Sequence, residues 1–224
     1  LYSSAASDVY KSQITGGGSG IGKAIAVTFA AQGASVHVLE LTTEAGADTA
    51  ATIQAAGGQV TVHACNVANK EEVTAVFASI GQLDILVNNA GVAHIGKADT
   101  TPEADFDRVM SINVKGVYQC IAAAIPGFRT NGRGVIINMA SIAAWVGLAD
   151  RFVYSTAKGA VMAMTLSVAK DYMHENIRCN SISPARVHTP FVDGFIAKNY
   201  PGKEKEMFEK LSASQPIGLS LIHI

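Results

Sequence analysis

Short apolar runs alternate with longer helical patterns along most of the chain. The apolar runs predict strands at residues 35–39, 59–64, 84–87, 135–139 and 177–182. The segments between them predict helices at residues 24–31, 43–56, 70–79, 102–110, 112–128 and 154–174, and a helical excursion over 189–211. Strands separated by helices indicate βαβ units, so the sequence predicts one α/β domain with a doubly wound parallel sheet.

The two ends of the chain break this pattern. A buried, nearly all-apolar strand is expected just before Thr15, yet Lys11, Ser12 and Gln13 are polar. Apart from Ser12, residues 3–13 resemble the translation of a sequencing-library adapter, and residues 219–224 fit the other strand of that adapter. We therefore expect residues 1–13 and 219–224 to be non-native, with the native reading running from about Ile14 to Gly218.

Composition excludes several functional classes. The 224 residues are 49% hydrophobic and 16% charged, with a formal net charge of -1, which argues against disorder and offers no electrostatic case for nucleic acid or anionic membrane. No apolar run looks long enough to span a bilayer, and the first residues lack the pattern of a secretory signal. The three cysteines are far apart and predict buried thiols, and the scattered histidines predict no metal site.

A glycine-rich turn follows the expected first strand, in the sequence Thr-Gly-Gly-Gly-Ser-Gly-Ile-Gly at residues 15–22. Gly16 suits a tight turn, Gly20 lets the backbone approach a pyrophosphate, and Gly22 permits close packing of helix on strand. The amides at the start of the following helix favour phosphates. Glu40 ends the second strand and is placed to bind ribose hydroxyls, while its carboxylate repels a 2′-phosphate; alternatively it merely caps the strand.

A tyrosine and a lysine, Tyr154 and Lys158, lie four residues apart in the long predicted helix and therefore share one face. An ammonium near a phenol favours the phenolate, so we expect Lys158 to lower the pKa of Tyr154. That arrangement predicts a general acid/base for use near neutral pH. A pair at this spacing also occurs on many solvated helix faces.

With the sequence Asn-Asn-Ala-Gly at 88–91, and with Asn113 and Ser141, these motifs resemble the short-chain dehydrogenase/reductase family over residues 14–218. The resemblance implies a Rossmann-like fold whose last strand is missing from this chain. It also implies catalytic roles: Tyr154 exchanges a proton with the substrate, and Lys158 holds the nicotinamide ribose. Ser141 bonds the reacting oxygen, and Asn113 holds a water that connects Lys158 to solvent.

The same resemblance implies an NAD site. Two of its positions depart from the family pattern, since Asn66 stands where relatives carry Asp and Ala185 stands where they carry Gly. Asn66 can still accept a hydrogen bond from the adenine amine, whereas Ala185 puts the geometry of its loop in question. The residues implied to bind NAD are Gly16, Gly18, Ser19, Gly20, Ile21, Gly22, Glu40, Leu41, Asn66, Val67, Asn89, Ala90, Gly91, Tyr154, Lys158, Pro184, Val187 and Thr189.

The substrate end has fewer signals. Arg151 lies three residues before Tyr154, where a guanidinium can clamp a carboxylate; a surface salt bridge, for instance with Asp150, explains it equally well. Trp145, Arg186, His188 and Phe191 are further candidates for the substrate pocket, although core packing accounts for Trp145 equally well.

Together these features predict a cytoplasmic, NAD-dependent oxidoreductase that interconverts a secondary alcohol and a ketone on a small hydroxy acid or sugar-derived substrate. One alternative is an NADPH-dependent 3-oxoacyl thioester reductase. The other is a non-catalytic nucleotide-binding protein on the same scaffold. Members of the family are commonly tetramers, so the resemblance also implies a homotetramer for the intact enzyme.

Overall fold

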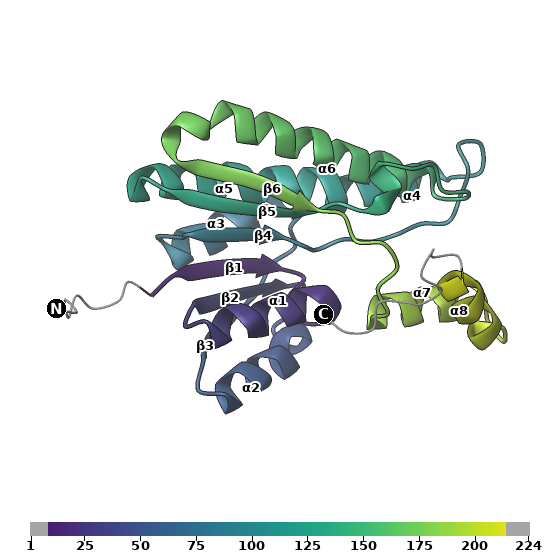
Figure 1. The fold of residues 1–224 in the computed structure, drawn as a ribbon, viewed down its shortest axis with the longest axis horizontal. Coiled ribbons are helices and arrows are strands. Elements are labelled where there is room, and N and C mark those ends of the chain that lie inside the picture. Colours follow the sequence, from purple (N-terminus) through teal and green to yellow (C-terminus); the bar gives the residue numbers. More distant parts are fainter. Residues whose placement is uncertain (1–8, 214–224) are drawn as a thin grey trace.

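The computed structural model of the chain describes residues 9–213. Within this part, parallel strands form one sheet in the order β3-β2-β1-β4-β5-β6 (Figure 1). The order reverses direction at β1, from which the chain builds outward first on one side and then on the other. This is the doubly wound arrangement that the alternating pattern predicts. The strands are β1 (Lys11–Thr15), β2 (Ser35–Glu40), β3 (Gln59–Ala64), β4 (Ile85–Asn88), β5 (Gly134–Met139) and β6 (Ile177–Ile182).

Helices cover the sheet on both faces. On one face α1 (Gly20–Ala31) and α2 (Ala47–Ala55) pack against apolar residues of β1 and β2. On the other, α3 (Lys70–Ile80), α5 (Gly116–Asn131) and α6 (Phe152–Asp171) enclose a larger core that includes Leu86 and Ile136. Two further helices, α7 (Pro190–Asn199) and α8 (Glu204–Ala213), lie beyond the carboxyl ends of the strands (Figure 1).

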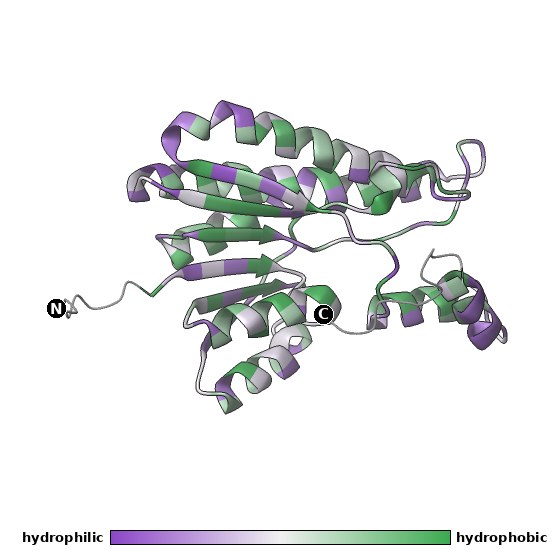
Figure 2. Cartoon of the chain, viewed as in Figure 1, coloured by the Kyte–Doolittle hydropathy of each residue, from purple (hydrophilic) through white to green (hydrophobic). Residues whose placement is uncertain are grey.

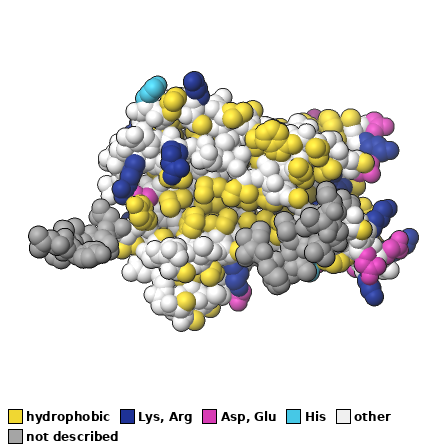
Figure 3. Space-filling model, in the orientation of Figure 1, with side chains coloured by type: hydrophobic (Ala, Val, Ile, Leu, Met, Phe, Trp, Pro, Cys, Tyr) yellow, Lys and Arg dark blue, Asp and Glu magenta, His cyan; other side chains and the backbone are white. Residues whose placement is uncertain are grey.

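The face that carries α1 and α2 is covered unevenly. Over β4–β6 no helix among residues 9–213 packs on it, and hydrophobic side chains show at the surface of this view (Figure 3). Ile85 and Ile137 are partly buried there, and Ile182 on the outer strand β6 is exposed. The family resemblance implies that a last strand is missing from this chain. That expectation falls outside the described residues and stays a prediction.

Strand β1 forms where the sequence analysis placed a central strand, despite its polar residues (Figure 2). It pairs with β2 on one side and β4 on the other, and Ser12 and Gln13 are fully buried. The Ser12 hydroxyl and both amide atoms of Gln13 have no hydrogen-bond partner among the described residues. The non-native origin expected for residues 1–13 stays a prediction, and residues 219–224 lie outside the described part.

Two predicted helical segments differ from the structure. The helices expected at 102–110 and 112–128 are joined, because α4 (Glu103–Met110) continues through a π-helical turn, Ser111–Lys115, into α5. The excursion expected over 189–211 is divided into α7 and α8. Pro201 and Gly202 lie between them, and Gly202 adopts a φ of 78°, which ends regular helix.

Helix α6 corrects one expectation from composition. Among the described residues it is long and apolar enough to cross a membrane by length and composition alone. That is weak evidence, since the central helices of many domains pass the same test. Here α6 packs along β5 and β6, with Val153, Ala157 and Val161 fully buried. The packing of this fold therefore explains the apolar residues on the buried face of α6.

Candidate active site

A cavity of about 730 Å³ runs along the carboxyl ends of the strands, bounded on its far side by α7 and α8. Most of the residues predicted from sequence line it, which places them in one continuous space. These are Gly16, Ser19, Gly20, Ile21, Glu40, Leu41, Asn66, Val67, Asn89, Ala90, Gly91, Ser141, Arg151, Tyr154, Lys158, Pro184, Arg186, Val187 and Thr189. Gly18, Gly22, Asn113 and Trp145 do not form part of its wall.

The glycine turn leaves no room for side chains. A Cβ on Gly22 would lie 2.1 Å from the carbonyl oxygen of Gly16, so Gly22 serves close packing of α1 on β1, as predicted. Gly16 adopts a φ of 65°, and a Cβ there would meet Ala90 Cα at 2.9 Å. Gly20 opens α1 with a φ of 54° and lies close to Thr189 across the cavity. The turn is thus a bare backbone cradle at a helix N-terminus, which fits a pyrophosphate.

Hydrogen bonds fix this cradle from two directions. The side-chain amide of Asn89 donates to the carbonyl oxygens of Thr15 (3.1 Å) and Gly16 (2.9 Å). The backbone amides of Asn89 and Ala90 in turn donate to Thr15 Oγ1, each at 3.0 Å. From the other side, the buried Thr49 hydroxyl on α2 lies 3.0 Å from Gly17 O and 3.1 Å from Gly18 O. Sequence reasoning missed Thr49, because nothing in its own surroundings points to this contact.

Glu40 lies at the end of the cavity that the adenosine ribose is expected to occupy. Its Oε1 accepts a hydrogen bond of 2.8 Å from the Gly18 amide, which orients the carboxylate beside the turn. Gly18 does not line the cavity itself, and its backbone amide instead orients the Glu40 carboxylate. This contact fits both the predicted ribose-binding role and the alternative in which Glu40 caps the strand.

The two departures from the family pattern are accommodated. Asn66 lines the cavity, and its Oδ1 accepts a hydrogen bond from the Ala68 amide at 3.0 Å, so one of its two lone pairs is already used. Ala185 also lines the cavity. Its φ is not positive, because among the described residues other than glycine positive φ occurs at Asp150 and Asn176. Ala185 therefore does not need the conformation that glycine favours.

Asn113 sits at the centre of the π-helical turn and is fully buried. Its Oδ1 accepts from the Val92 amide at 2.9 Å, and its Nδ2 donates to the Val92 carbonyl at 2.8 Å. Gly91 separates it from Lys158: a Cβ on Gly91 would lie 3.4 Å from Asn113 Oδ1 and 3.6 Å from Lys158 Nζ. The structure thus brings Asn113 close to Lys158, although the side-chain amide of Asn113 is already hydrogen-bonded to the backbone of Val92.

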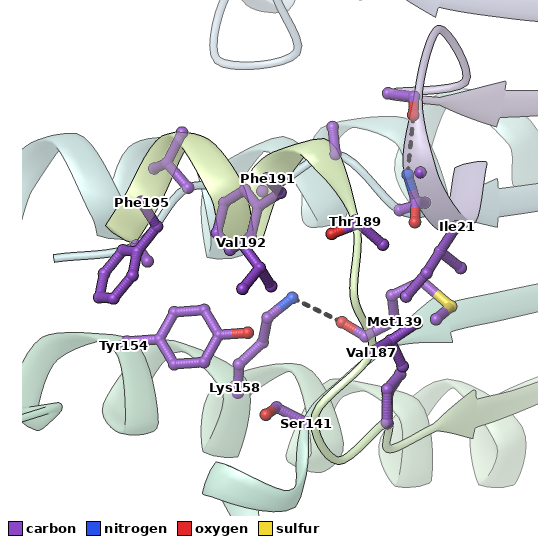
Figure 4. A pocket seen from close by; sticks show the side chains of 18 of the residues that line it. Ile21, Met139, Ser141, Tyr154, Lys158, Val187, Thr189, Phe191, Val192 and Phe195 are labelled. Atoms are coloured by element: carbon purple, nitrogen blue, oxygen red, sulfur yellow. Dashed lines mark hydrogen bonds between the residues drawn. The ribbon is translucent and has the colours of Figure 1, made fainter. Parts of the chain in front are cut away.

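Lys158 reaches into the cavity from α6, and its ammonium donates to the Met139 carbonyl at 2.7 Å (Figure 4). Its Nζ lies 5.8 Å from the centre of the Tyr154 ring. Burial disfavours the charged form and lowers the pKa of Lys158 to about 8. The carbonyl at the end of β5 therefore provides the acceptor for a lysine that has little contact with water.

The environment of Tyr154 corrects the expectation about its acidity. Burial raises the pKa of the phenol, and the hydrogen bond with Ser141 and the charge of Arg151 oppose that rise only in part. In this structure desolvation outweighs the neighbouring charges, so the phenol is held in its protonated form at neutral pH.

The end of the cavity near Tyr154 carries two arginines. The Arg151 Nη1 donates to the backbone carbonyl of Asp150 at 3.0 Å, so its contact with Asp150 is not the salt bridge considered as the alternative. Burial and the charge of Arg151 both lower the pKa of Arg186, which places the two guanidinium groups within electrostatic reach of each other. Phe191, a candidate from the sequence, lies on the wall at this end, together with aliphatic and aromatic side chains that the sequence did not identify: Val146, Leu148, Val192, Phe195 and Phe208.

Trp145 lies outside the cavity wall. Its side chain is 65% exposed, and its indole N–H donates to the Ser183 hydroxyl at 3.0 Å. Neither pocket lining nor core packing describes this position. The neighbouring Ser141 does line the cavity, and its hydroxyl accepts from the Ala143 amide at 3.2 Å.

Comparison with known proteins places this site in a family. A family model described as short chain dehydrogenase matches residues 12–199. The chain belongs to the short-chain dehydrogenase/reductase family. It is 40% identical over 185 residues to the 2-(R)-hydroxypropyl-CoM dehydrogenase of Xanthobacter autotrophicus, which covers 79% of this chain and 74% of that enzyme.

A further relative is the 2-keto-3-deoxy-L-fuconate dehydrogenase of Xanthomonas campestris pv. campestris, 35% identical over 206 residues, covering 92% of this chain and 67% of that protein. Among solved structures, levodione reductase matches with a TM-score of 0.90 at 28% identity, over 94% of this chain and 84% of its own. Short-chain dehydrogenase/reductase membership makes this chain an oxidoreductase that acts on CH–OH groups with a nicotinamide cofactor, NAD or NADP.

Proposed function

We propose that this short-chain dehydrogenase/reductase is an NAD(H)-dependent enzyme that interconverts a secondary alcohol and a ketone on a small hydroxy acid or sugar-derived acid. The observation that carries the proposal is the meeting of Tyr154, Ser141 and Lys158 with Arg151 on the wall of one cavity. The first three fit proton exchange at the oxygen of an alcohol or ketone. The guanidinium fits an acid group on the same substrate.

The chemistry divides between the cofactor and the protein. Bound NAD⁺ supplies the hydride acceptor. Ser141 and Tyr154 bind the substrate oxygen, and Tyr154 accepts its proton during oxidation or donates one during reduction. Because burial raises the pKa of Tyr154, the phenol is ready to donate to a carbonyl oxygen at neutral pH. Oxidation requires loss of that proton, which the Ser141 hydrogen bond and the Arg151 charge favour.

We infer a preference for NAD from Glu40. The carboxylate, oriented by the Gly18 amide, fits the two hydroxyls of an adenosine ribose and repels a 2′-phosphate. Ser19 lines the same end of the cavity and brings no positive charge to it. The rival function, an NADPH-dependent reductase of 3-oxoacyl thioesters, needs a cation where Glu40 lies.

Titration of the purified chain with NADH and separately with NADPH tests this preference. We expect NADH to bind at least tenfold more tightly, and Glu40→Gln to narrow the difference by removing the repulsion. Preference of the parent for NADPH overturns the assignment and favours the thioester reductase.

The catalytic assignment is tested by Tyr154→Phe, which removes the phenolic oxygen and keeps the ring. We expect kcat to fall by about 10²- to 10⁴-fold, the usual contribution of a positioned acid/base, while the affinity for NADH is kept. Turnover by the variant at the parent's rate contradicts the mechanism. Absence of turnover by the parent on every alcohol or ketone tried, with NADH bound, supports the non-catalytic alternative.

Location and assembly complete the proposal. The three cysteines are free and buried, which supports a reducing compartment such as the cytoplasm. Tyr118 on α5 and Leu166 on α6 are 59% and 67% exposed, which supports a homotetramer paired through these helices. Size-exclusion chromatography with light scattering tests the assembly, and a monomer at micromolar concentration contradicts it.

A further inference from the structure

A contact between α7 and α6 crosses the end of the cavity near Tyr154. The guanidinium carbon of Arg151, at the start of α6, lies 4.8 Å from the centre of the Phe195 ring on α7. Both residues line the cavity, and Phe195 and Tyr154 lie on the same side of it (Figure 4). At this distance the cation is attracted by the electron-rich face of the ring.

A cation–π contact uses the charge of the guanidinium and none of its five N–H donors, which lie in the plane of the group. One donor, on Nη1, is directed to the Asp150 carbonyl. That bond and the contact with Phe195 together restrict the position of the group, and its other N–H donors stay able to bind a second acceptor.

The backbone also contributes to this orientation. Asp150 adopts a φ of 57°, which is uncommon for a residue other than glycine. Backbone hydrogen bonds hold the segment in place, from the Gly96 amide to the Asp150 carbonyl at 3.1 Å and from the Phe152 amide to the Gly96 carbonyl at 3.1 Å. Arg151 thus leaves a constrained segment, and Phe195 constrains the far end of its side chain.

The charge at this end of the cavity indicates its ligand. Arg151 brings a positive charge to a wall that also carries aromatic rings of α7. A planar or tetrahedral oxyanion matches the in-plane donors of its guanidinium. A neutral substrate of the same shape gains nothing from this arrangement.

We propose that Phe195 is a positioning residue: its ring holds the Arg151 guanidinium with its edge toward the acid group of the substrate and thereby sets selectivity for acids over neutral alcohols. This inference rests on the proposed function. It assigns to α7 a part in substrate recognition beyond covering the cavity.

The test compares matched pairs of substrates in the NADH- or NAD-bound enzyme. Lactate is paired with lactamide, and 3-hydroxybutyrate with 3-hydroxybutyramide, so that the carboxylate is the difference within each pair. The measured quantity is the ratio of KM values within a pair, or of Kd values where a compound is not turned over. For Phe195→Leu we expect this acid preference to fall by about 3- to 20-fold, with kcat kept. Phe195→Tyr, which retains an aromatic face, is expected to restore it.

Two further variants identify the cause of any change. Phe191→Leu removes a ring one turn earlier on α7 and on the same wall, where no guanidinium is stacked among the described residues, so it is expected to alter acid and amide alike. Arg151→Leu is expected to abolish the acid preference. In that background Phe195→Leu is expected to have no additional effect on the ratio, because the group that it positions is gone.

A spectroscopic measurement checks the contact without a substrate. In a ¹⁵N-labelled protein the ring current of Phe195 shifts the Arg151 Nε–H resonance, and we expect that shift to be lost in Phe195→Leu and kept in Phe195→Tyr. The thermal midpoint of each variant controls for unfolding.

The outcomes separate the two proposals. If Arg151→Leu leaves the acid preference of the parent unchanged, or if the parent binds no acid better than its amide, the proposed acid substrate is wrong and this inference falls with it. If Arg151→Leu abolishes the preference and Phe195→Leu does not reduce it, the substrate class stands and the role of Phe195 is wrong.

Discussion

Strands β1 and β5 both lie inside the sheet, each with a parallel neighbour on either side, and both bury polar side chains. In β5 the polar residue is Asn138. Its Oδ1 accepts from Asn88 Nδ2 at 2.8 Å, and its Nδ2 donates to Thr165 Oγ1 at 2.9 Å. In β1 the buried Thr15 hydroxyl is hydrogen-bonded, whereas the side-chain polar atoms of Ser12 and Gln13 have no partner within residues 9–213.

The difference shows what makes a buried polar group acceptable in a central strand. Asn138 links β4, β5 and α6, and the next residue, Met139, presents the carbonyl that receives Lys158. Each hydrogen bond there replaces one lost to water, although Asn88 Oδ1 has no partner among the described residues. At Ser12 and Gln13 of β1 the cost of desolvation is left uncompensated.

The largest effect is expected from repairing β1. Ser12→Ala combined with Gln13→Met removes the orphaned atoms with little change of volume. Because each unsatisfied buried group costs roughly 1–3 kcal/mol, we expect the free energy of unfolding to rise by about 2–5 kcal/mol. Urea denaturation of the parent and the double variant measures the change.

Thr15→Val is the matched control in the same strand. The Thr15 hydroxyl accepts from two backbone amides, each at 3.0 Å, so this variant is expected to lose about 1–3 kcal/mol. A gain in the free energy of unfolding for the double variant and a loss for Thr15→Val support the contrast between unpaired and paired polar groups. A loss in the double variant contradicts it, because it shows that Ser12 and Gln13 contribute favourable contacts.

Much of the fold could be predicted from local pattern. The ranges 59–64 and 177–182 coincide with β3 and β6, because alternating apolar and polar residues bounded by turns indicate the strand limits. The glycine turn and the pair Tyr154 and Lys158 could be predicted from their spacing within regular elements, and Ser141 could be predicted from the family resemblance.

What sequence could not provide depends on contacts between distant segments. Thr49 and Phe195 act on residues far away in the chain, and neither belongs to a motif. The pKa of Tyr154 was predicted in the wrong direction, because the spacing of Tyr154 and Lys158 says nothing of burial or of the Met139 carbonyl that binds the ammonium. The joined helix through Asn113 was missed because a π-helical turn has no clear local signal.

The second prediction concerns the lysine bound to β5. Burial disfavours the ammonium, so the folded state carries this penalty in full below pH 8 and loses it as the pH rises toward 10.5, where the lysine of the unfolded chain also becomes neutral. Relative to Lys158→Met, the free energy of unfolding of the parent should therefore rise by roughly 3 kcal/mol between these pH limits.

Urea midpoints at intervals of pH measure the difference in stability between the two proteins. The exposed Lys170 on the same helix, replaced by Met, shows what loss of a surface lysine does. A difference that stays constant across this range contradicts a buried, weakly basic Lys158.

The smallest effect on stability is expected from removing one hydrogen bond from the network of Asn88, Asn138 and Thr165. Thr165→Val keeps the shape of the side chain and removes the hydroxyl that accepts from Asn138 Nδ2 and donates to the Val161 carbonyl. Asn138 then retains Cys179 Sγ, a weak acceptor at 3.5 Å, so we expect a loss of about 1–2 kcal/mol, with Thr165→Ser intermediate. Measurements of kcat distinguish a catalytic role of this hydrogen-bond network from a purely stabilising one. If Thr165→Val also lowers kcat while Thr165→Ser keeps it, the network holds the Met139 carbonyl, and through it Lys158, in place for catalysis. If kcat is unchanged in both, the paired amides of β5 serve stability alone, and the contrast with β1 is one of folding and not of chemistry.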